Sequence, residues 1–305
     1  MNKEALLQRD VLVKRFGGEL SRYKTRLARL DLSPNTREAY RSRLNNFLGY
    51  LATSSQDYSD FFDDSACRAL AVREYKSHLK REHASPATVN SSLTAIDHFL
   101  KFLGLEKPKA KREQLPDLAP QALSKHEQMR LLVIADHARP IDRAIIYLLL
   151  YSGIRLSECA DLNVEDLLIS ERKGKVIVRD GKGGQYREVP LNSDARAAIE
   201  PWLAERARRE SKKKVSEAVF LNPQGKRLSR RSIDKAVRKL GLKSGIELSA
   251  HTLRHTCLTN LMRAGSDVGI VAQIAGHKKL ETTKRYTLPR KEDLESAMEG
   301  ISLER

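Results

Sequence analysis

Apolar residues recur at helical spacing through the first third of the chain. The two clearest stripes consist of Tyr40, Leu44, Phe47, Leu48 and Leu51, and of Val89, Leu93, Ile96, Leu100 and Leu103. Steps of three and four residues place such side chains on one face of an α-helix. Between the stripes, Leu70, Tyr75 and Leu79 indicate a third helix that ends near residues 80–84. These patterns predict a small domain built from helices.

Both stripes are preceded by the same short signal, Ser-Pro-x-Thr, at residues 33–36 and 85–88. A serine side chain can accept a hydrogen bond from the first turn of a helix. The proline that follows it suits the first helical position, where the missing N–H leaves no bond unmade. The repeat predicts two similar helix starts within an N-terminal helical domain at residues 1–106.

The helical spacing stops near residue 105, and the next stretch is basic and contains several prolines. Residues 107–122 are therefore expected to form an extended linker. Ser124 and Glu127 form a capping-box pattern that opens a second domain, residues 123–305. Two segments, 175–179 and 186–190, look like strands on either side of a glycine-rich turn. The fold class expected is mainly α, with a mixed α+β second domain that holds a small β-sheet.

The amino-acid composition indicates which class of partner this protein binds and in which compartment it works. Lys and Arg total 56 against 39 Asp and Glu, so the net charge of +17 favours nucleic acid as a partner. Cys67, Cys159 and Cys257 lack Cys-x-x-Cys spacing, which indicates neither a disulfide framework nor a cysteine zinc site and fits a reducing compartment. We find neither a signal-peptide pattern nor an apolar run of membrane-spanning length. A cytoplasmic protein without a membrane partner is expected.

Arg155 and Glu158 follow Gly153, which is expected to end a helix with its body at residues 141–151. Two interpretations stay open. An Arg three residues before a Glu is most often a surface ion pair. Alternatively, the glycine break lets Arg155 reach a ligand, and Glu158 fixes its orientation.

Lys182 lies among glycines at the tip of the predicted hairpin. It is either a turn residue without a role or a mobile proton donor to a leaving oxygen. A phosphate-binding P-loop is excluded, because Gly183 follows where that motif requires Ser or Thr.

His251 and Arg254 are three residues apart, so a helix would present them on one face. His251 and His255, four apart, raise the question of a zinc site. Thr252 stands where the metalloprotease motif needs Glu, and Arg254 would place a fixed positive charge beside the ion, so no metal site is predicted. His255 is interpreted as a hydrogen-bonded packing residue.

His277 follows Gly276 at an expected helix end, and Tyr286 comes nine residues later in what reads as a short polar helix. A tyrosine beside Lys284 and Arg285 is usually an exposed surface residue. A phenol is also a capable covalent nucleophile. On that interpretation we expect the neighbouring cations to lower its pKa.

The order of these groups resembles the tyrosine recombinase, or phage integrase, family. The residues that carry the resemblance are Arg155, Lys182, His251-x-x-Arg254, His277 and Tyr286. The Ser-Pro-x-Thr helix starts resemble the family's N-terminal core-binding, SAM-like domain, so the resemblance extends over nearly the whole chain. The compact length is similar to that of simple Xer-like or transposon-resolving members.

The resemblance implies a mechanism and its residues. Tyr286 would attack a DNA phosphate to give a 3′-phosphotyrosyl link, and Arg155 and Arg254 would hold the non-bridging oxygens. His251 would assist proton transfer from the phenol, His277 would form a hydrogen bond to the phosphate, and Lys182 would protonate the 5′ oxygen. Glu158 and His255 would support these groups. It also implies no cofactor and no metal, double-stranded DNA as partner, and a homotetramer on two DNA sites.

Two alternatives to a recombinase remain, a type IB topoisomerase and a non-catalytic DNA-binding protein with a decayed site. A further question concerns the acidic C-terminal segment after Tyr286. Its apolar residues at helical spacing are Leu294, Ala297, Met298 and Ile301. The segment either packs on its own domain or, as the resemblance implies, docks into a neighbouring protomer.

Overall fold

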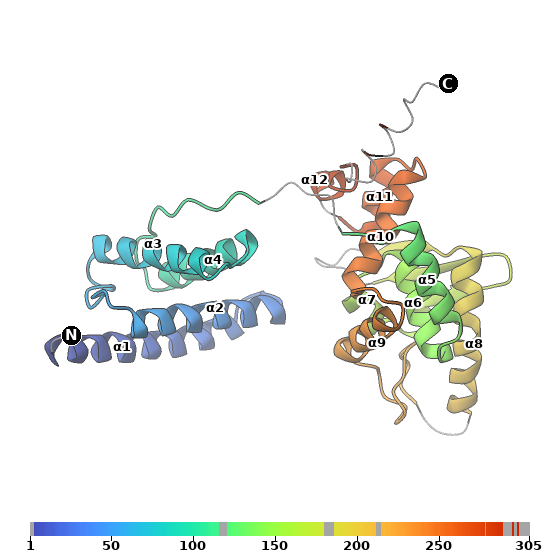
Figure 1. Cartoon of the computed structure of the whole chain (residues 1–305). Coiled ribbons are helices and arrows are strands. Elements are labelled where there is room, and N and C mark those ends of the chain that lie inside the picture. The colour runs from blue at the N-terminus through green and yellow to red at the C-terminus, as the bar shows by residue number, and fades with distance from the viewer. Residues whose placement is uncertain are drawn as a thin grey trace. The chain divides into compact units, whose positions relative to one another are not determined.

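A computed structural model describes residues 3–115, 121–179, 186–211, 215–277 and 279–288, together with 295 and 298. The chain divides into two compact units, Met1–Pro116 and Asp117–Arg305. In Figure 1 the first unit runs from blue to green and the second from green to red.

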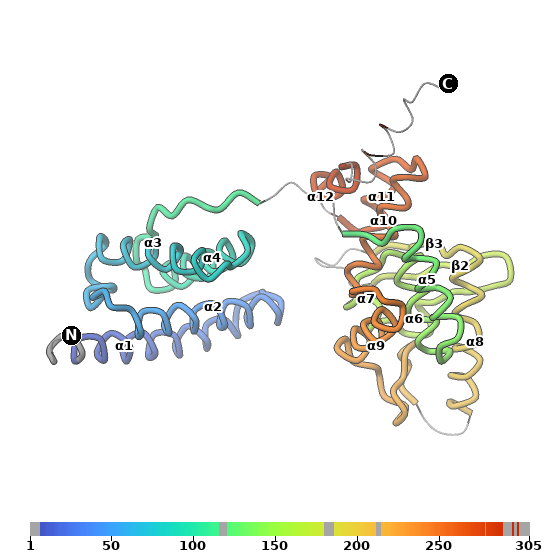
Figure 2. The backbone as a smooth tube through the Cα atoms, in the orientation of Figure 1, coloured from blue at the N-terminus to red at the C-terminus, as the bar shows by residue number. Residues whose placement is uncertain are grey.

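The N-terminal unit contains four described helices, α1 (Lys3–Ala28), α2 (Pro34–Thr53), α3 (Ser65–Arg81) and α4 (Pro86–Phe102). The repeated helix-start signal is confirmed. Ser33 accepts a hydrogen bond from the backbone of Thr36, and Ser85 accepts one from the backbone of Thr88. The predicted third helix is α3. Sequence reasoning did not identify α1, which packs along α2 (Figure 2).

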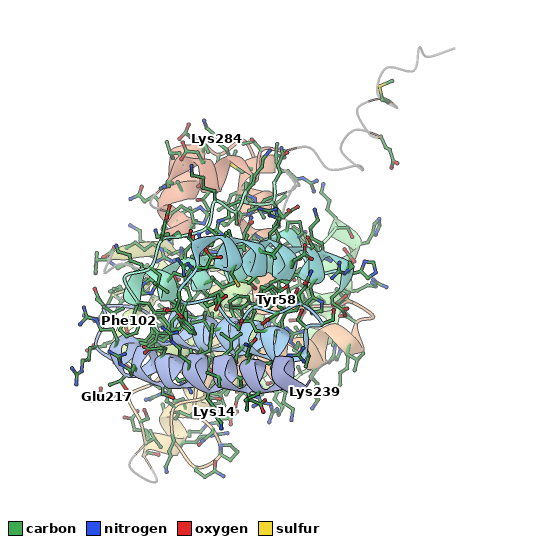
Figure 3. The ribbon with its side chains drawn as sticks, turned by 90° about the vertical axis from the view of Figure 1, so that its left-hand side faces the viewer. Lys14, Tyr58, Phe102, Glu217, Lys239 and Lys284 are labelled. Atoms are coloured by element: carbon green, nitrogen blue, oxygen red, sulfur yellow. The ribbon has the colours of Figure 1, made fainter. Side chains whose placement is uncertain are left out.

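Aromatic rings fill the core of this unit. Phe16 of α1 lies 5.8 Å from Phe47 of α2 and 5.0 Å from Phe99 of α4, measured between ring centroids. These contacts join three helices through one buried side chain. Figure 3 draws the side chains, and the residues it labels include the exposed Lys14 and the buried Tyr58.

The second unit is arranged around α6 (Pro140–Ser152), which is buried along most of its length. Its other described helices are α5 (Lys125–Asp136), α7 (Leu156–Asp161), α8 (Ser193–Glu210), α9 (Arg230–Lys243), α10 (Ala250–Arg263), α11 (Val268–Ala275), α12 (Leu280–Lys284) and the 3-10 helix η1 (Val164–Asp166). Helices α5, α8, α9 and α10 all pack against α6. The predicted capping box at Ser124 and Glu127 is present at the start of α5.

A three-stranded antiparallel sheet lies beside these helices, in the order β1 (Leu167–Ile169), β2 (Gly174–Val178), β3 (Arg187–Pro190). Val176 at the centre pairs with Leu167 on one side and Val189 on the other. The two predicted strands are therefore confirmed, with bounds shifted by about one residue, whereas β1 was not predicted. The turn that carries Lys182 lies outside the described residues.

Among the residues that the structure describes, we find no helix that combines the length and apolar character needed to cross a membrane.

Candidate active site

Two glycines with left-handed backbone create the turns that gather the polar groups. Gly153 ends α6 with a φ of 62°, and Gly276 ends α11 with a φ of 62°. Both match the sequence prediction, since glycine adopts this conformation without a steric penalty. Arg155 follows the first turn and His277 the second. Helices α10, α11 and α12 lie close together in Figure 1, and α11 also contacts β3.

Arg155 stands at the start of α7 and makes two hydrogen bonds with its guanidinium. Nη1 donates to Oε1 of Glu158 over 2.7 Å, and Nη2 donates to the carbonyl of Gly276 over 3.0 Å. The Arg155 side chain is 26% exposed, whereas that of Glu158 is only 3% exposed. The pair is therefore not the surface ion pair considered from the sequence. The buried Glu158 carboxylate holds one side of the Arg155 guanidinium, while the Arg155 side chain stays partly exposed to solvent.

Glu158 is also held by Arg187 of β3, a residue that sequence reasoning missed. Arg187 Nη2 lies 2.6 Å from Oε2 of Glu158 and Nη1 lies 3.1 Å from Oε1. Burial opposes ionisation of Glu158, but the hydrogen bonds from Arg187 and Arg155 prevail and lower its pKa to about 2. The carboxylate is thus charged at neutral pH and is shared by two guanidiniums.

Arg254 of α10 is buried and is hydrogen bonded to the C-terminal ends of two other helices, α6 and α11. Its Nη1 donates to the carbonyl of Gly153, and its Nη2 donates to the carbonyl of Ala275 over 2.7 Å. The same nitrogen lies 3.1 Å from Nε2 of His277. Burial, followed by the charge of Arg155, lowers the pKa of Arg254 to about 10, so the group stays protonated at neutral pH. A fixed positive charge is therefore held in the interior.

The contact with Arg254 determines the tautomer of His277. A guanidinium can only donate, so Nε2 of His277 must accept and Nδ1 must carry the proton. Nδ1 then donates to the Thr283 hydroxyl, 2.8 Å away on α12. Burial, followed by the charge of Arg254, lowers the pKa of His277 to about 4, in agreement with a neutral ring.

Tyr286 follows α12 rather than lying within it, so the prediction of a short helix around it is wrong by two residues. Its side chain is only 7% exposed and packs against Leu258, Val271 and Ala275. Burial raises the pKa of the phenol, and the charges of Arg254 and Arg285 offset only part of that effect. The cations therefore lower the pKa as expected, but the expected net fall is wrong because burial has the larger effect.

The phenol is hydrogen bonded to His255, whose Nδ1 lies 2.7 Å from the Tyr286 hydroxyl oxygen. His251 stacks edge-on against His255, with 4.0 Å between ring centroids. The sequence indicated a packing role for His255 and did not reveal that its partner is Tyr286. The signal available was its position beside Arg254, but the contact spans 31 residues of sequence and becomes visible only in the fold.

The structure thus brings together most of the residues singled out from the sequence. The connected group consists of Arg155, Glu158, His251, Arg254, His255, His277 and Tyr286, with Arg187 as an addition. Lys182 lies outside the described residues. Within the described part of the chain, no cluster of three or more His, Cys, Asp or Glu side chains is arranged to hold a metal ion. The cluster offers buried guanidiniums, neutral imidazoles and a phenol, the groups needed to bind an anion and attack it.

Comparison with known proteins gives the cluster a family context. Residues 121–293 match the phage integrase family, and residues 20–107 match the phage integrase N-terminal SAM-like domain. The tyrosine recombinase XerA of Pyrococcus furiosus is 30% identical over 291 residues, which cover 93% of this chain and 94% of the relative. The tyrosine recombinase XerC of Pelotomaculum thermopropionicum is 33% identical over 275 residues, or 84% of this chain and 88% of the relative.

Solved structures agree with the sequence matches. A crystal structure of XerA recombinase aligns with a TM-score of 0.52 at 25% identity, covering 94% of this chain and all of that one. A lambda integrase dimer bound to a core site aligns with a TM-score of 0.68 at 15% identity, covering 90% and 96%, which shows a shared fold. With both of its units matched and relatives aligned over most of its length, this chain belongs to the phage integrase family of tyrosine recombinases.

Proposed function

We propose that this protein is a site-specific DNA recombinase that cuts and rejoins duplex DNA through a covalent bond between Tyr286 and a DNA phosphate. The observation that carries the proposal is the joint placement of a phenol and two guanidiniums at the end of α11. Arg155 is hydrogen bonded to Gly276 and Arg254 to Ala275, and Tyr286 packs in the same cluster as Ala275. Guanidiniums bind phosphate oxygens with paired donors. A phenol held beside them is positioned to attack the phosphorus.

The reaction follows from these groups. The Tyr286 oxygen forms a bond to phosphorus, the bond from phosphorus to the 5′ oxygen breaks, and the strand is left with a 3′-phosphotyrosyl link and a free 5′ hydroxyl. Arg155 and Arg254 stabilise the charge that builds on the non-bridging oxygens, and His277 adds a hydrogen bond. Lys182 gives its proton to the departing 5′ oxygen. Because the phosphotyrosyl link keeps the energy of the phosphodiester, rejoining needs neither a nucleotide nor a metal ion.

The net charge of +17 supports binding to double-stranded DNA, with an affinity that falls steeply as salt rises. Residues 1–106 would bind one side of the duplex and residues 123–305 would carry the chemistry, joined by the linker 107–122. A lambda integrase tetramer bound to a Holliday junction is among the solved structures of similar fold. We propose that this chain likewise acts as a homotetramer on two sites, with its C-terminal segment docked into a neighbouring protomer.

Two other functions use similar groups. A type IB topoisomerase acts as a monomer and relaxes supercoils, and a decayed member would bind DNA without cutting it. The match of residues 20–107 to the SAM-like domain of integrases favours a recombinase over a topoisomerase. The intact set of Arg155, Arg254, His277 and Tyr286 argues against decay.

The experiment begins with the DNA site. Tyr286→Phe protein, which keeps the ring and loses only the nucleophilic oxygen, is used to capture sheared DNA of the source genome. The bound duplex is then labelled, nicked beside the cleavage position to trap the product, and incubated with wild-type protein. A denaturing gel should show a covalent adduct for the wild type and none for Tyr286→Phe, although both bind the duplex equally.

The same assay separates the alternatives. An adduct in the Tyr286→Phe protein would assign the attack to another residue. Binding without any wild-type adduct would indicate a non-catalytic DNA-binding protein. Relaxation of a supercoiled plasmid with one site, without exchange between two sites, would indicate a topoisomerase.

A further inference from the structure

The Tyr286 hydroxyl has a defined partner, Nδ1 of His255, 2.7 Å away. His251, the residue that the family resemblance implies for proton transfer, contacts the ring of His255 instead. Among the hydrogen bonds of the described residues, none joins His251 to the phenol. The geometry therefore separates two histidines of similar chemistry, because only one of them touches the group that must lose a proton.

The direction of this hydrogen bond depends on the protonation states of the two groups and on the tautomer of His255. Burial, followed by the charges of His251 and Arg254, lowers the pKa of His255 to about 3, so its ring is neutral. Burial also raises the pKa of the Tyr286 phenol, which therefore keeps its proton. With a neutral imidazole and a protonated phenol, the phenol donates to Nδ1 when the ring hydrogen is on Nε2, and Nδ1 donates to the phenol oxygen when the ring hydrogen is on Nδ1. The tautomer with its hydrogen on Nε2 is the one in which Nδ1 can take the proton of the phenol.

We propose that His255 is the catalytic base that takes the proton of Tyr286 as its oxygen attacks the phosphate, and that returns the proton when the strand is rejoined. This inference rests on the proposed recombinase function. In the forward step the phenolic O–H bond breaks, the proton moves to Nδ1, the oxygen bonds to phosphorus and the 5′ oxygen departs. In the reverse step the same proton returns to the tyrosine oxygen, so protons balance over a complete cycle.

The surrounding charges explain why the proton stays on the phenol until DNA is bound. An imidazolium at His255 would lie near the positive groups that already lower its pKa, Arg254 and Arg285 among them. A phosphodiester held by Arg155 and Arg254 brings a negative charge into this cluster. That charge offsets the repulsion and makes the protonated ring less unfavourable. The base is thereby activated by the substrate on which the nucleophile acts.

Two substitutions distinguish a base from a residue that merely holds the phenol. His255→Asn places an amide oxygen near the position of Nδ1, so it can still accept the hydrogen bond but cannot take the proton. His255→Ala removes both functions. His251→Asn serves as the matched variant at the neighbouring histidine. Thermal unfolding and binding to the captured duplex are measured for each protein.

Single-turnover cleavage is then measured on the ordinary duplex and on one with sulfur in place of the 5′-bridging oxygen. We expect His255→Asn and His255→Ala to cleave both substrates about 100-fold more slowly than wild type, in line with the usual contribution of a general base. Lys182→Ala should cleave only the ordinary duplex slowly. A sulfur leaving group needs no proton, so cleavage of the sulfur-substituted duplex should be close to normal. This contrast assigns the defect at His255 to the nucleophile rather than to the leaving group.

Wild-type cleavage by His255→Asn would overturn the proposal and leave His255 with a positioning role. So would a defect confined to His251→Asn. Nitrogen NMR of the free protein, without DNA, gives an independent check. It should place the ring proton of His255 on Nε2. A ring proton on Nδ1 would also overturn the proposal. Failure of the recombinase function itself would appear differently, as the absence of any adduct with wild-type protein.

Discussion

The guanidinium of Arg187 occupies the space that a side chain at position 276 would need, and the residue there is Gly276. A β-carbon built at Gly276 would lie 2.9 Å from Nη1 and 3.1 Å from Cζ of that side chain. The carbonyl of the same glycine accepts a hydrogen bond from Arg155, and His277 is the next residue. One glycine thus fixes the spacing among three groups of the proposed active site.

Gly276→Ala is expected to impair both stability and cleavage. The alanine would be strained at a φ of 62°, and its methyl group would push the buried Arg187 away from Glu158. Gly265→Ala is the matched control, since Gly265 has a φ of 80° with no atom within 4 Å of the added carbon. We expect the control to lose about 1 kcal/mol of unfolding free energy from backbone strain alone and to cleave normally. Urea denaturation and adduct formation measure the two effects, and equal behaviour of both variants would show that the contact with Arg187 is unimportant.

Arg187→Met should be strongly destabilising, because it leaves the Glu158 carboxylate buried without its two-pronged partner. Breaking one side of a buried ion pair typically costs about 3 to 5 kcal/mol. Lys175→Met removes a cation from another ion pair of the same sheet, with Glu188, but both partners there are well exposed. The control should unfold close to the wild-type midpoint. Chemical denaturation of the two variants tests the difference, and a similar small change in both would mean that Arg187 contributes little.

Glu158 should also make stability depend on pH in a defined window. Its pKa is lowered from 4.5 to about 2 in the folded protein, so ionisation favours the folded state. That contribution is fully present above about pH 4.5 and is lost as the pH falls toward 2. Glu158→Gln cannot ionise, so its deficit in unfolding free energy relative to wild type should shrink over this range. Urea denaturation at pH 7, 4 and 3 measures the deficit; a constant value would show that the charge of Glu158 does not stabilise the fold.

Features set by a few adjacent residues could be predicted from the sequence. The caps at Ser33, Ser85 and Ser124 and the glycine turn at Gly153 depend only on local geometry, and all four are present. Helix α1, which was not predicted, also has a recognisable helical pattern in the sequence. Its buried residues fall at steps of three and four, at Leu12, Phe16, Leu20, Tyr23 and Leu27. Strand β1, by contrast, has three residues, too few for a recognisable alternation.

The contacts within the proposed site could not be derived in the same way. Arg187 meets Glu158 across 29 residues and His255 meets Tyr286 across 31, and no local rule relates such positions. The pKa of Tyr286 was mispredicted for a related reason. The sequence shows the cations beside it but not its burial, which here has the larger effect. The family resemblance identified most of the residues of the proposed site. The contacts that these residues make with one another became visible only in the structure.

Arg155→Lys and Arg254→Lys should both slow cleavage but differ in stability. A lysine cannot reproduce the two-pronged grip on phosphate, so we expect a loss of about 100-fold or more in either variant. Arg254 is 3% exposed, and a lysine there would leave the carbonyls of Gly153 and Ala275 short of donors in the interior. Arg155 is more exposed, so its replacement should barely change the unfolding midpoint.

Single-turnover cleavage and thermal unfolding, measured on the same preparations, test this pair. The cleavage defect should persist at saturating protein, because the arginines act on the transition state and not only on DNA binding. Wild-type cleavage by Arg155→Lys would return that residue to an ion-pair role. If Arg254→Lys were as stable as wild type, the hydrogen bonds from Arg254 to the ends of α6 and α11 would not be needed to hold the site together. In that case Arg254 would contribute to cleavage and not to the stability of the fold.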